Sequence, residues 1–188
     1  MSKKEKIGIF VGSLRQKSFS KCIANFITET EFDSVEFEII ELGELPIYNQ
    51  DFDDIGPTPS SYTDFRTKVS SLDGFLFITP EYNRSVPAVL KNALDVGSRP
   101  YGKSVWNNKP GAIISQSPGH LSGFGANHHL RQSLVFLNVL PMQQPEAYIA
   151  KITDCIDEDG NISNKNTQQF LKDFIYAFEK WIKVTKHS

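Results

Sequence analysis

The stretch from Gly12 to Ser18 (GSLRQKS) gathers hydroxyl and guanidinium groups directly after an apolar run. Its serines offer O–H donors and Arg15 offers a planar fork of N–H donors, which together suit a phosphate dianion. Backbone N–H groups at a helix start favour the same anion. Neither G-x-x-x-x-G-K-[ST] nor G-x-G-x-x-G is present, so the stretch favours a terminal monophosphate over a triphosphate or a pyrophosphate.

A plainer interpretation gives this stretch no ligand. Ser18 would then cap the helix that follows, and Arg15 would be a solvated surface charge. The stretch alone does not decide between the two interpretations. The decision depends on which other polar segments the fold brings next to it.

Two further polar segments follow apolar runs, and both have the composition of ligand-binding loops. The first of these two segments lies between Pro80 and Pro87, which stiffen it. We expect free backbone groups of four of its residues to contact a planar ligand rich in heteroatoms: Glu81, Tyr82, Asn83 and Arg84. The Tyr82 ring could pack against such a ligand, although an ordinary rigid turn is the alternative. In the second loop, five small residues permit close backbone approach: Ser117, Gly119, Ser122, Gly123 and Gly125.

The apolar runs alternate with turns and helical patterns along the chain. Four runs have strand length: Ile7–Val11, Val35–Ile40, Gly74–Thr79 and Gly111–Ser115. This alternation predicts an α/β protein with a parallel sheet and crossover helices. Because such sheets bind ligands outside the carboxyl ends of their strands, the three polar segments are expected to face one cleft.

Apolar residues at helical spacing predict the elements around that sheet. Helices are expected over 19–27, 87–97, 127–137 and 170–182, with a short strand somewhere in 139–150. Pro141 and Pro145 obscure the register of that last strand, because proline cannot donate to a ladder. The segment from Asp51 to Ser61 is interpreted as a loop within the domain.

Length and charge indicate the class of protein. The chain has 188 residues, with 20 Lys and Arg against 22 Asp and Glu and a net charge of -2. We therefore expect one domain over residues 1–188 and neither nucleic acid nor an anionic membrane as partner. The apolar run Ile7–Val11 is too short for a signal peptide or a membrane span, which predicts a cytoplasmic protein. Cys22 and Cys155 are isolated and are interpreted as plain thiols.

No residue of the chain is predicted to bind a metal or to act as a catalytic acid, base or nucleophile. His128 and His129 are adjacent, so on a helix they point about 100° apart and cannot readily share one ion. The acidic segment from Asp154 to Asn161 lacks the spacing of a calcium loop and is interpreted as a solvated turn.

Three ordered segments, GSLRQKSFSK, TPEYNRSVPAVLKNALDVGSRP and SPGHLSGFGANHHLRQSLVFLNV, resemble the NADPH-dependent FMN reductase family. That family includes quinone, azo-dye and chromate reductases, and the resemblance spans about Lys6 to Met142. It implies a flavodoxin-like three-layer sandwich in which a five-stranded parallel sheet has the strand order 2-1-3-4-5.

The resemblance also implies where FMN binds. Its phosphate would lie against Ser13, Arg15, Ser18, Phe19 and Ser20. The isoalloxazine ring would be bordered, mainly through backbone groups, by Pro80, Glu81, Tyr82, Asn83 and Arg84. Ser117 and Gly119 would approach the ring from the fourth strand.

The implied activity is electron transfer from NADPH or NADH through FMN to a small acceptor, with ping-pong kinetics because both substrates use one flavin face. Quinones, azo compounds, free flavin and chromate all suit that role. Arg84 or Arg99 could meet the 2′-phosphate of NADPH, or either could be a surface charge. Two other hypotheses are an FMN electron carrier between proteins and a regulatory module that keeps the fold without flavin.

The chain is also expected to form a homodimer. Tyr101 and Trp106 are interpreted as exposed aromatic residues beside the flavin site, and exposed apolar surface marks interfaces. The dimer would use the helices predicted over 87–97 and 127–137, with each subunit helping to wall the other's flavin site. A homotetramer is a further possibility, although Asn127 and His128 stand where relatives commonly have Gln and Tyr.

Overall fold

Buried β-branched and aromatic residues form the strands of a central parallel sheet. The computed structural model describes residues 3–186. The strands are β1 (Glu5–Val11), β2 (Val35–Ile40), β3 (Gly74–Thr79), β4 (Pro110–Gln116), β5 (Leu140–Pro141) and β6 (Ala147–Ile149). Their order is β2-β1-β3-β4-β5, with β6 also paired to β4, and every pairing is parallel. The predicted order 2-1-3-4-5 is confirmed.

The predicted fifth strand is divided into two short pieces. Leu140 lies opposite Pro110 near the start of β4, whereas Ala147 lies opposite Ile114 near its end. Pro141 and Pro145 occupy the region of the break, and neither has the N–H group that a continuous ladder needs. The interruption therefore has its cause in the two prolines that obscured the register.

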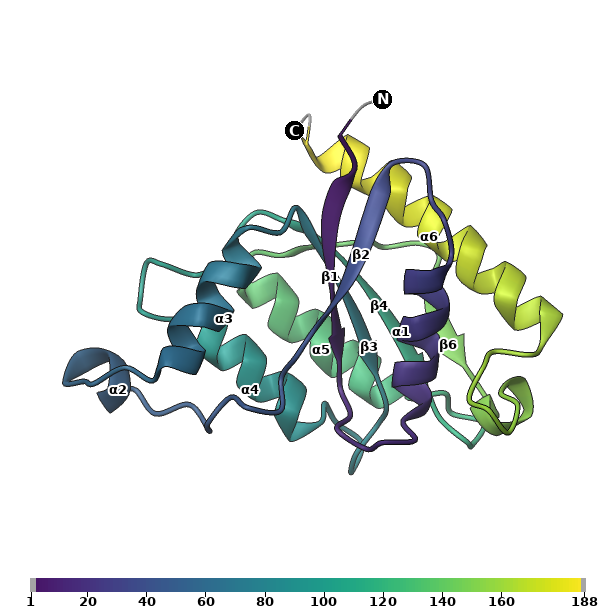
Figure 1. The fold of residues 1–188 in the computed structure, drawn as a ribbon, viewed down its shortest axis with the longest axis horizontal. Helices are drawn as coiled ribbons and strands as arrows, with labels where there is room; N and C mark the ends of the chain where they lie inside the picture. Colours follow the sequence, from purple (N-terminus) through teal and green to yellow (C-terminus); the bar gives the residue numbers. More distant parts are fainter. Residues whose placement is uncertain (1–2, 187–188) are drawn as a thin grey trace.

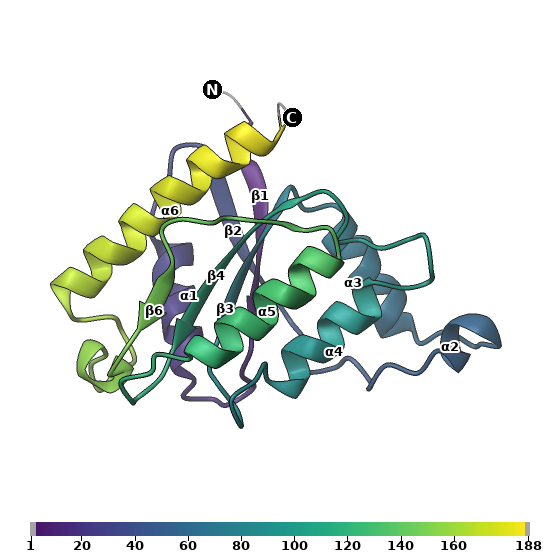
Figure 2. The ribbon, with the colours of Figure 1, turned by 180° about the vertical axis from the view of Figure 1, so that it is seen from behind.

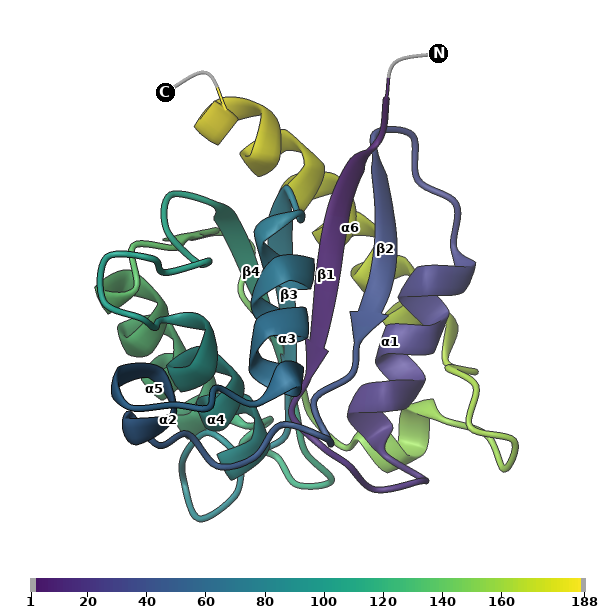
Figure 3. The same ribbon diagram turned by 60° about the vertical axis from the view of Figure 1, so that its left-hand side comes forward.

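Helices cover both faces of the sheet, as the flavodoxin-like interpretation requires (Figure 1). Helices α1 (Phe19–Glu29) and α6 (Lys165–Lys186) lie on one face. On the other face lie α3 (Ser60–Ser70), α4 (Ala88–Gly97) and α5 (Phe124–Phe136). The three layers are seen edge-on in Figure 3. A short 3-10 helix, η1 (Ile152–Cys155), precedes α6.

Two apolar cores hold these layers together, one on each face of the sheet. On the α3–α5 face, Phe10 of β1 packs against Phe77 of β3 and against Trp106. The expectation that Trp106 is exposed was wrong, since its exposed fraction is 0%. Its indole Nε1–H donates to the Leu94 carbonyl (3.0 Å), and the ring lies so close to Gly97 that any side chain there would clash. Tyr101 is exposed as expected.

The segment interpreted as a loop contains a short helix, α2 (Asp51–Asp54), which projects from the body of the protein (Figure 1). Arg66 of α3 holds it by a bidentate ion pair to Asp53 (2.7 and 2.8 Å). The Tyr48 hydroxyl donates to the same carboxylate (3.2 Å). The Arg66 guanidinium keeps the pKa of Asp53 below its ordinary value, and burial raises the pKa of Tyr48.

The carboxyl ends of β1, β3 and β4 lie at one edge of the sheet, at the bottom of Figure 1. The loops that leave these ends are the three segments singled out from the sequence. Within residues 3–186, no helix has both the length and the apolar character needed to cross a membrane.

Candidate functional site

The three strand-end loops meet around a cavity of about 350 Å³, called here the strand-end cavity. The residues that line it come from the loops after β1, β3 and β4: Ser13, Arg15, Ser18, Phe19, Pro80, Glu81, Tyr82, Gln116, Ser117 and Pro118. The structure thus brings most of the predicted site residues together. Gln116 and Pro118 were not predicted. Ser20, Asn83, Arg84 and Gly119 were predicted but do not line this cavity.

Gly12 allows the first two of these loops to lie close together. Its N–H donates to the carbonyl of Ile78 in β3 (2.8 Å). A Cβ at this position would stand only 3.1 Å from Pro80 Cδ and from Thr79 Oγ1. Gly12 is therefore needed for the close approach of the two loops and does not belong to a glycine-rich phosphate-binding motif.

The loop from Gly12 to Ser18, called here the first loop, carries the basic side of the cavity. Ser18 caps α1, since its Oγ accepts from Lys21 N (3.3 Å). The hydroxyl also has its own O–H to donate, so capping does not prevent it from binding a ligand. Arg15 is exposed and places its guanidinium 5.4 Å over the Phe19 ring. The cap and the exposed arginine of the plainer interpretation are thus both present, and both residues line the cavity.

The loop after β3 folds into a two-residue hairpin from Glu81 to Ser85, called here the hairpin turn. The backbone N–H groups of Tyr82 and Ser85 each donate to the other residue's carbonyl (3.1 and 2.9 Å). Asn83 (φ 49°) and Arg84 (φ 64°) occupy the left-handed region that this turn requires. The expectation that the Tyr82 backbone is free was therefore wrong, because both of its groups close the hairpin. The Tyr82 ring is half-exposed at the cavity.

The Glu81 side chain fastens the hairpin turn to the start of α5. Its Oε2 accepts from the Ala126 backbone N–H (3.0 Å), in the first turn of that helix. Its Oε1 accepts from Arg84 Nη1 (3.1 Å). A carboxylate at this position satisfies an otherwise unpaired N–H group and complements the positive end of the helix dipole. No sequence pattern indicates this contact, because the two residues are 45 positions apart.

Two further features tighten the same junction. Gly125 lies so close to the hairpin turn that a Cβ there would be 2.9 Å from Glu81 Oε2 and 3.0 Å from the Arg84 carbonyl oxygen. One helical turn further on, His129 Nδ1 and Ser85 Oγ are 3.0 Å apart. The hairpin turn thus meets α5 at three residues, Gly125, Ala126 and His129.

The loop after β4 is ordered by two hydrogen bonds to the Gly119 carbonyl, one from within the loop and one from Lys151. Ser117 Oγ donates to the Gly119 carbonyl (3.1 Å), and Lys151 N donates to the same oxygen (3.2 Å). Gln116 ends β4 with its side chain almost fully buried, and its Nε2 donates to Ser20 Oγ (3.0 Å). Ser20 has an exposed fraction of 0%, so it lies behind the cavity wall.

Tyr148 and Cys22 are among the other groups whose pKa values are shifted. Burial, reinforced by Glu146, raises the pKa of Tyr148 in β6 to about 12, so this phenol stays neutral. Burial also raises the pKa of the Cys22 thiol in α1. Among residues 3–186, no group of three or more His, Cys, Asp or Glu side chains is arranged to hold a metal ion.

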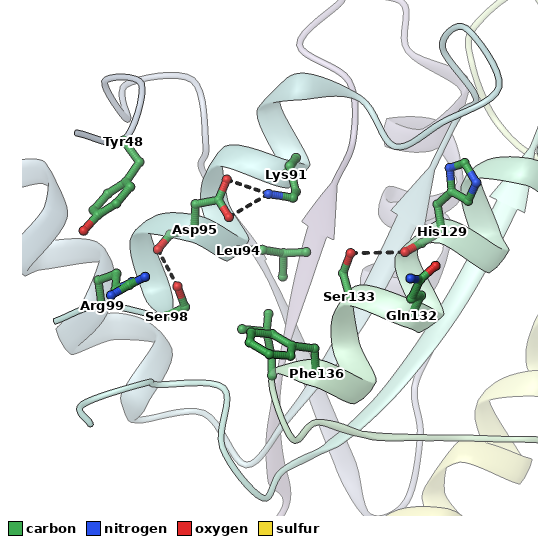
Figure 4. A pocket seen from close by; sticks show the side chains of 11 residues that line it. Tyr48, Lys91, Leu94, Asp95, Ser98, Arg99, His129, Gln132, Ser133 and Phe136 are labelled. Carbon is green, nitrogen blue, oxygen red and sulfur yellow. Dashed lines mark hydrogen bonds and ion pairs between the residues drawn. The ribbon is translucent and has the colours of Figure 1, made fainter. Parts of the chain in front are cut away.

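A larger groove of about 720 Å³ lies outside the strand-end cavity, between α4 and α5, which run side by side over the sheet (Figure 2). Figure 4 shows the Lys91–Asp95 ion pair on α4 and the side chains of His129 and Phe136 on α5 at this α4–α5 groove. The Phe136 side chain is 89% exposed. His129 lines this groove and also contacts Ser85, so it connects the groove to the hairpin turn.

Comparison with known proteins agrees with this geometry. A quinone reductase of Pseudomonas putida is 45% identical over 186 residues, which cover 99% of each chain. A 2-hydroxy-1,4-benzoquinone reductase of a Burkholderia species is 42% identical over 178 residues, which cover 95% of this chain and 96% of the relative. The solved structure of FerB, a flavoenzyme NAD(P)H:(acceptor) oxidoreductase from Paracoccus denitrificans, superposes with a TM-score of 0.85 at 34% identity, covering 96% of this chain and 98% of FerB.

The family model for NADPH-dependent FMN reductases matches residues 5–154. This range contains β1, β3 and β4, together with the three loops that form the strand-end cavity. The chain therefore belongs to the NADPH-dependent FMN reductase family.

Proposed function

We propose that this protein is a cytoplasmic, single-domain quinone reductase that binds FMN in the strand-end cavity. The FMN phosphate would lie at the first loop, against Ser13, Arg15, Ser18 and the N-terminus of α1. The isoalloxazine ring would lie against Pro80 and Tyr82, with Ser117 on the side of β4. The family uses FMN and a reduced nicotinamide. The Pseudomonas putida and Burkholderia relatives are named as quinone reductases, which supports a quinone as the electron acceptor.

The observation that carries the proposal is the convergence of three chemically different loops on one cavity. The first loop offers a guanidinium group, hydroxyl groups and the N–H groups of a helix start, which fit a phosphate. The loop after β3 offers proline and tyrosine surfaces, which fit a flat ring. FMN carries a phosphate at one end and a flat ring at the other, so the residues present fit this group.

Bound FMN supplies the redox chemistry, in which NAD(P)H and one proton reduce a quinone to a hydroquinone and NAD(P)⁺ is released. The chain's own residues bind the cofactor and orient it. Arg15 and the serines would fix the phosphate, and the hairpin turn, held rigidly to α5, would fix the ring plane. No side chain needs to act as an acid or base.

The strand-end cavity is open to solvent, and the Tyr82 ring at its edge is 48% exposed. We infer that nicotinamide and quinone use the same open face in turn, so the oxidised nicotinamide leaves before the quinone enters. Steady-state rates with NADPH and a quinone should give parallel double-reciprocal lines. Lines that intersect would show both substrates bound together and would contradict the shared face. The flavin-free chain should show no activity.

We also propose a two-fold homodimer formed across the α4–α5 groove, with a second copy of this chain as the occupant. A groove of about 720 Å³ beside an exposed Phe136 offers both a socket and a projecting side chain, as a self-complementary interface requires. His129 would connect the interface to the hairpin turn. Each subunit would then help to wall the other's flavin site.

Sedimentation equilibrium at micromolar concentration tests this assembly. The holoprotein should have twice the 21.2 kDa mass of the chain, and Phe136→Glu should shift it towards the monomer. A fully active protein that stays at the mass of one chain would exclude the shared-site dimer. A mass of four chains would indicate a tetramer, which requires a second interface.

A further inference from the structure

Gln116 has a buried side chain with one group left without a partner. It is the last residue of β4, it lines the strand-end cavity, and it is 3% exposed. Its Nε2 donates to Ser20 Oγ at 3.0 Å. Among the buried side-chain nitrogen and oxygen atoms of residues 3–186, only Gln116 Oε1 has no hydrogen-bond partner.

An unpaired buried carbonyl destabilises a protein, because its oxygen has lost its hydrogen bonds to water and has formed none within the protein. Such groups are uncommon in native proteins, and a partner that binds at the site is one explanation for an unpaired group in a cavity wall. An amide oxygen can only accept a hydrogen bond. The partner of Gln116 Oε1 must therefore carry an O–H or N–H donor.

FMN offers few donors of this kind. Its phosphate dianion and its ring carbonyl groups are acceptors, whereas the ribityl hydroxyls and the N3–H of the ring are donors. These two kinds of donor lie in different parts of the molecule. The position of Gln116 relative to the two ends of the cavity therefore distinguishes them.

The contacts of Gln116 place its amide beside the first loop. The amide is tied to Ser20, which stands in the first turn of α1, two residues after the cap residue Ser18. Two of the proposed ring contacts, Pro80 and Tyr82, come from the end of β3, and the third, Ser117, directly follows Gln116 in the chain. Gln116 thus faces the part of the cavity between the phosphate end and the ring end, which is where the chain that joins them must pass.

We propose that Gln116 Oε1 accepts a hydrogen bond from a hydroxyl group of the FMN ribityl chain. This inference rests on the proposed flavin site. Ser20 becomes a positioning residue, which holds the amide so that its oxygen faces the cavity. That role explains why Ser20 is fully buried, and it requires no direct contact with the cofactor.

The test compares flavins with and without the ribityl chain. The full chain is stripped of flavin, its native circular dichroism is checked, and it is titrated with FMN, riboflavin and lumiflavin by flavin fluorescence. Gln116→Met keeps the length of the side chain and removes the acceptor. It should weaken FMN and riboflavin binding by about tenfold, in line with one lost hydrogen bond, and should leave lumiflavin binding unchanged.

Two further variants complete the design. Gln168→Met is the matched control, because Gln168 also donates through Nε2, to the Ile162 carbonyl, in a part of the fold away from the cavity. It should change none of the three affinities. Ser20→Ala releases the Gln116 amide and should give a smaller loss with the same dependence on the ribityl chain, which keeps the test decisive if Gln116→Met folds poorly.

Each other outcome overturns the inference in a distinct way. Equal losses for riboflavin and lumiflavin would place the contact on the ring N3–H. Unchanged FMN affinity in Gln116→Met, beside a clear loss in Arg15→Ala, would reject the ribityl contact and keep the flavin site. Unchanged FMN affinity in both variants would reject the proposed flavin site itself.

Discussion

The first loop and the hairpin turn border the same cavity but are held in opposite ways. In the first loop, the Arg15 guanidinium donates within the loop, to the Lys17 carbonyl (3.2 Å). In the hairpin turn, the backbone closes on itself, and two side-chain contacts together with a close approach at Gly125 fasten it to α5. Ser13 and Arg15 of the first loop line the cavity, whereas the backbone groups and the Glu81 carboxylate of the hairpin turn are paired within the protein.

This difference separates two ways in which a site binds a cofactor. Groups without strong internal partners contribute directly to ligand affinity, because little is lost when they turn to a ligand. A turn locked in place before binding contributes by keeping a surface in position, which lowers the entropic cost of binding. Changes in the first loop should therefore affect flavin affinity, and changes at the hairpin turn should first affect the stability of the flavin-free chain.

The largest effect is expected for Arg15→Ala. Loss of a charge-assisted contact to the phosphate should weaken FMN binding by about 1.5 to 3 kcal/mol. The free energy of unfolding of the flavin-free chain should hardly change, because Arg15 is exposed. Fluorescence titration and thermal unfolding measure the two quantities. Lys17→Ala is the control, since Lys17 belongs to the same loop but does not line the cavity. Unchanged FMN affinity in Arg15→Ala would contradict the assignment.

Gly125→Ala should have the next largest effect and an unusual sign. Replacing a helical glycine by alanine normally stabilises a protein by about 0.5 to 1 kcal/mol. Here the new Cβ would meet the Glu81 carboxylate and the Arg84 carbonyl at 3.0 Å or less, so we expect a loss of about 1 to 3 kcal/mol in unfolding free energy. Gly43→Ala is the control, because its nearest contact would be an ordinary 3.6 Å to Leu14. A stabilised Gly125→Ala would show that the junction is loose.

Glu81→Ala tests the carboxylate that caps α5. Removing it leaves the Ala126 N–H unpaired, and the loss of a cap costs about 1 kcal/mol in unfolding free energy. Glu81→Gln keeps an acceptor for that N–H and should recover most of the loss. FMN affinity should fall less than it does in Arg15→Ala. A variant with unchanged stability and strongly weakened FMN binding would instead give Glu81 a direct contact with the cofactor.

The sequence predicted the sheet well because its strands are continuous apolar runs. The bounds of β2 and β3 agree with the predicted runs Val35–Ile40 and Gly74–Thr79. Helix α3 was not assigned to any residues, because its buried positions are few: Tyr62, Phe65 and Val69. Trp106 was misplaced because a tryptophan among polar residues looks exposed, whereas Gly97 opens space for its ring in the core.

The candidate site was predictable to the extent that its chemistry is local. Arg15 and the neighbouring serines lie within a few residues of one another, so their composition offered an anion site as one of two interpretations. Gln116 and the Glu81 contact with Ala126 depend on side chains meeting across separate strands and helices. A buried glutamine at a strand end carries no pattern in the sequence, and its unpaired oxygen is defined only by the folded surroundings.

The smallest effect is expected for Ser85→Ala, the outermost fastening of the hairpin turn. Its hydroxyl contacts His129 Nδ1 at 3.0 Å, and both side chains reach solvent, so water can replace the lost partner. A loss of about 0.5 kcal/mol in unfolding free energy follows, at the lower end for one hydrogen bond. Ser71→Ala, which removes a hydroxyl bonded to the Lys68 carbonyl on the other side of the molecule, is the matched control. FMN affinity should be unchanged in both. If Ser85→Ala weakened FMN binding as strongly as Arg15→Ala does, the hairpin turn would depend on His129 for its position, and the distinction between a locked turn and a ligand-binding loop would fail.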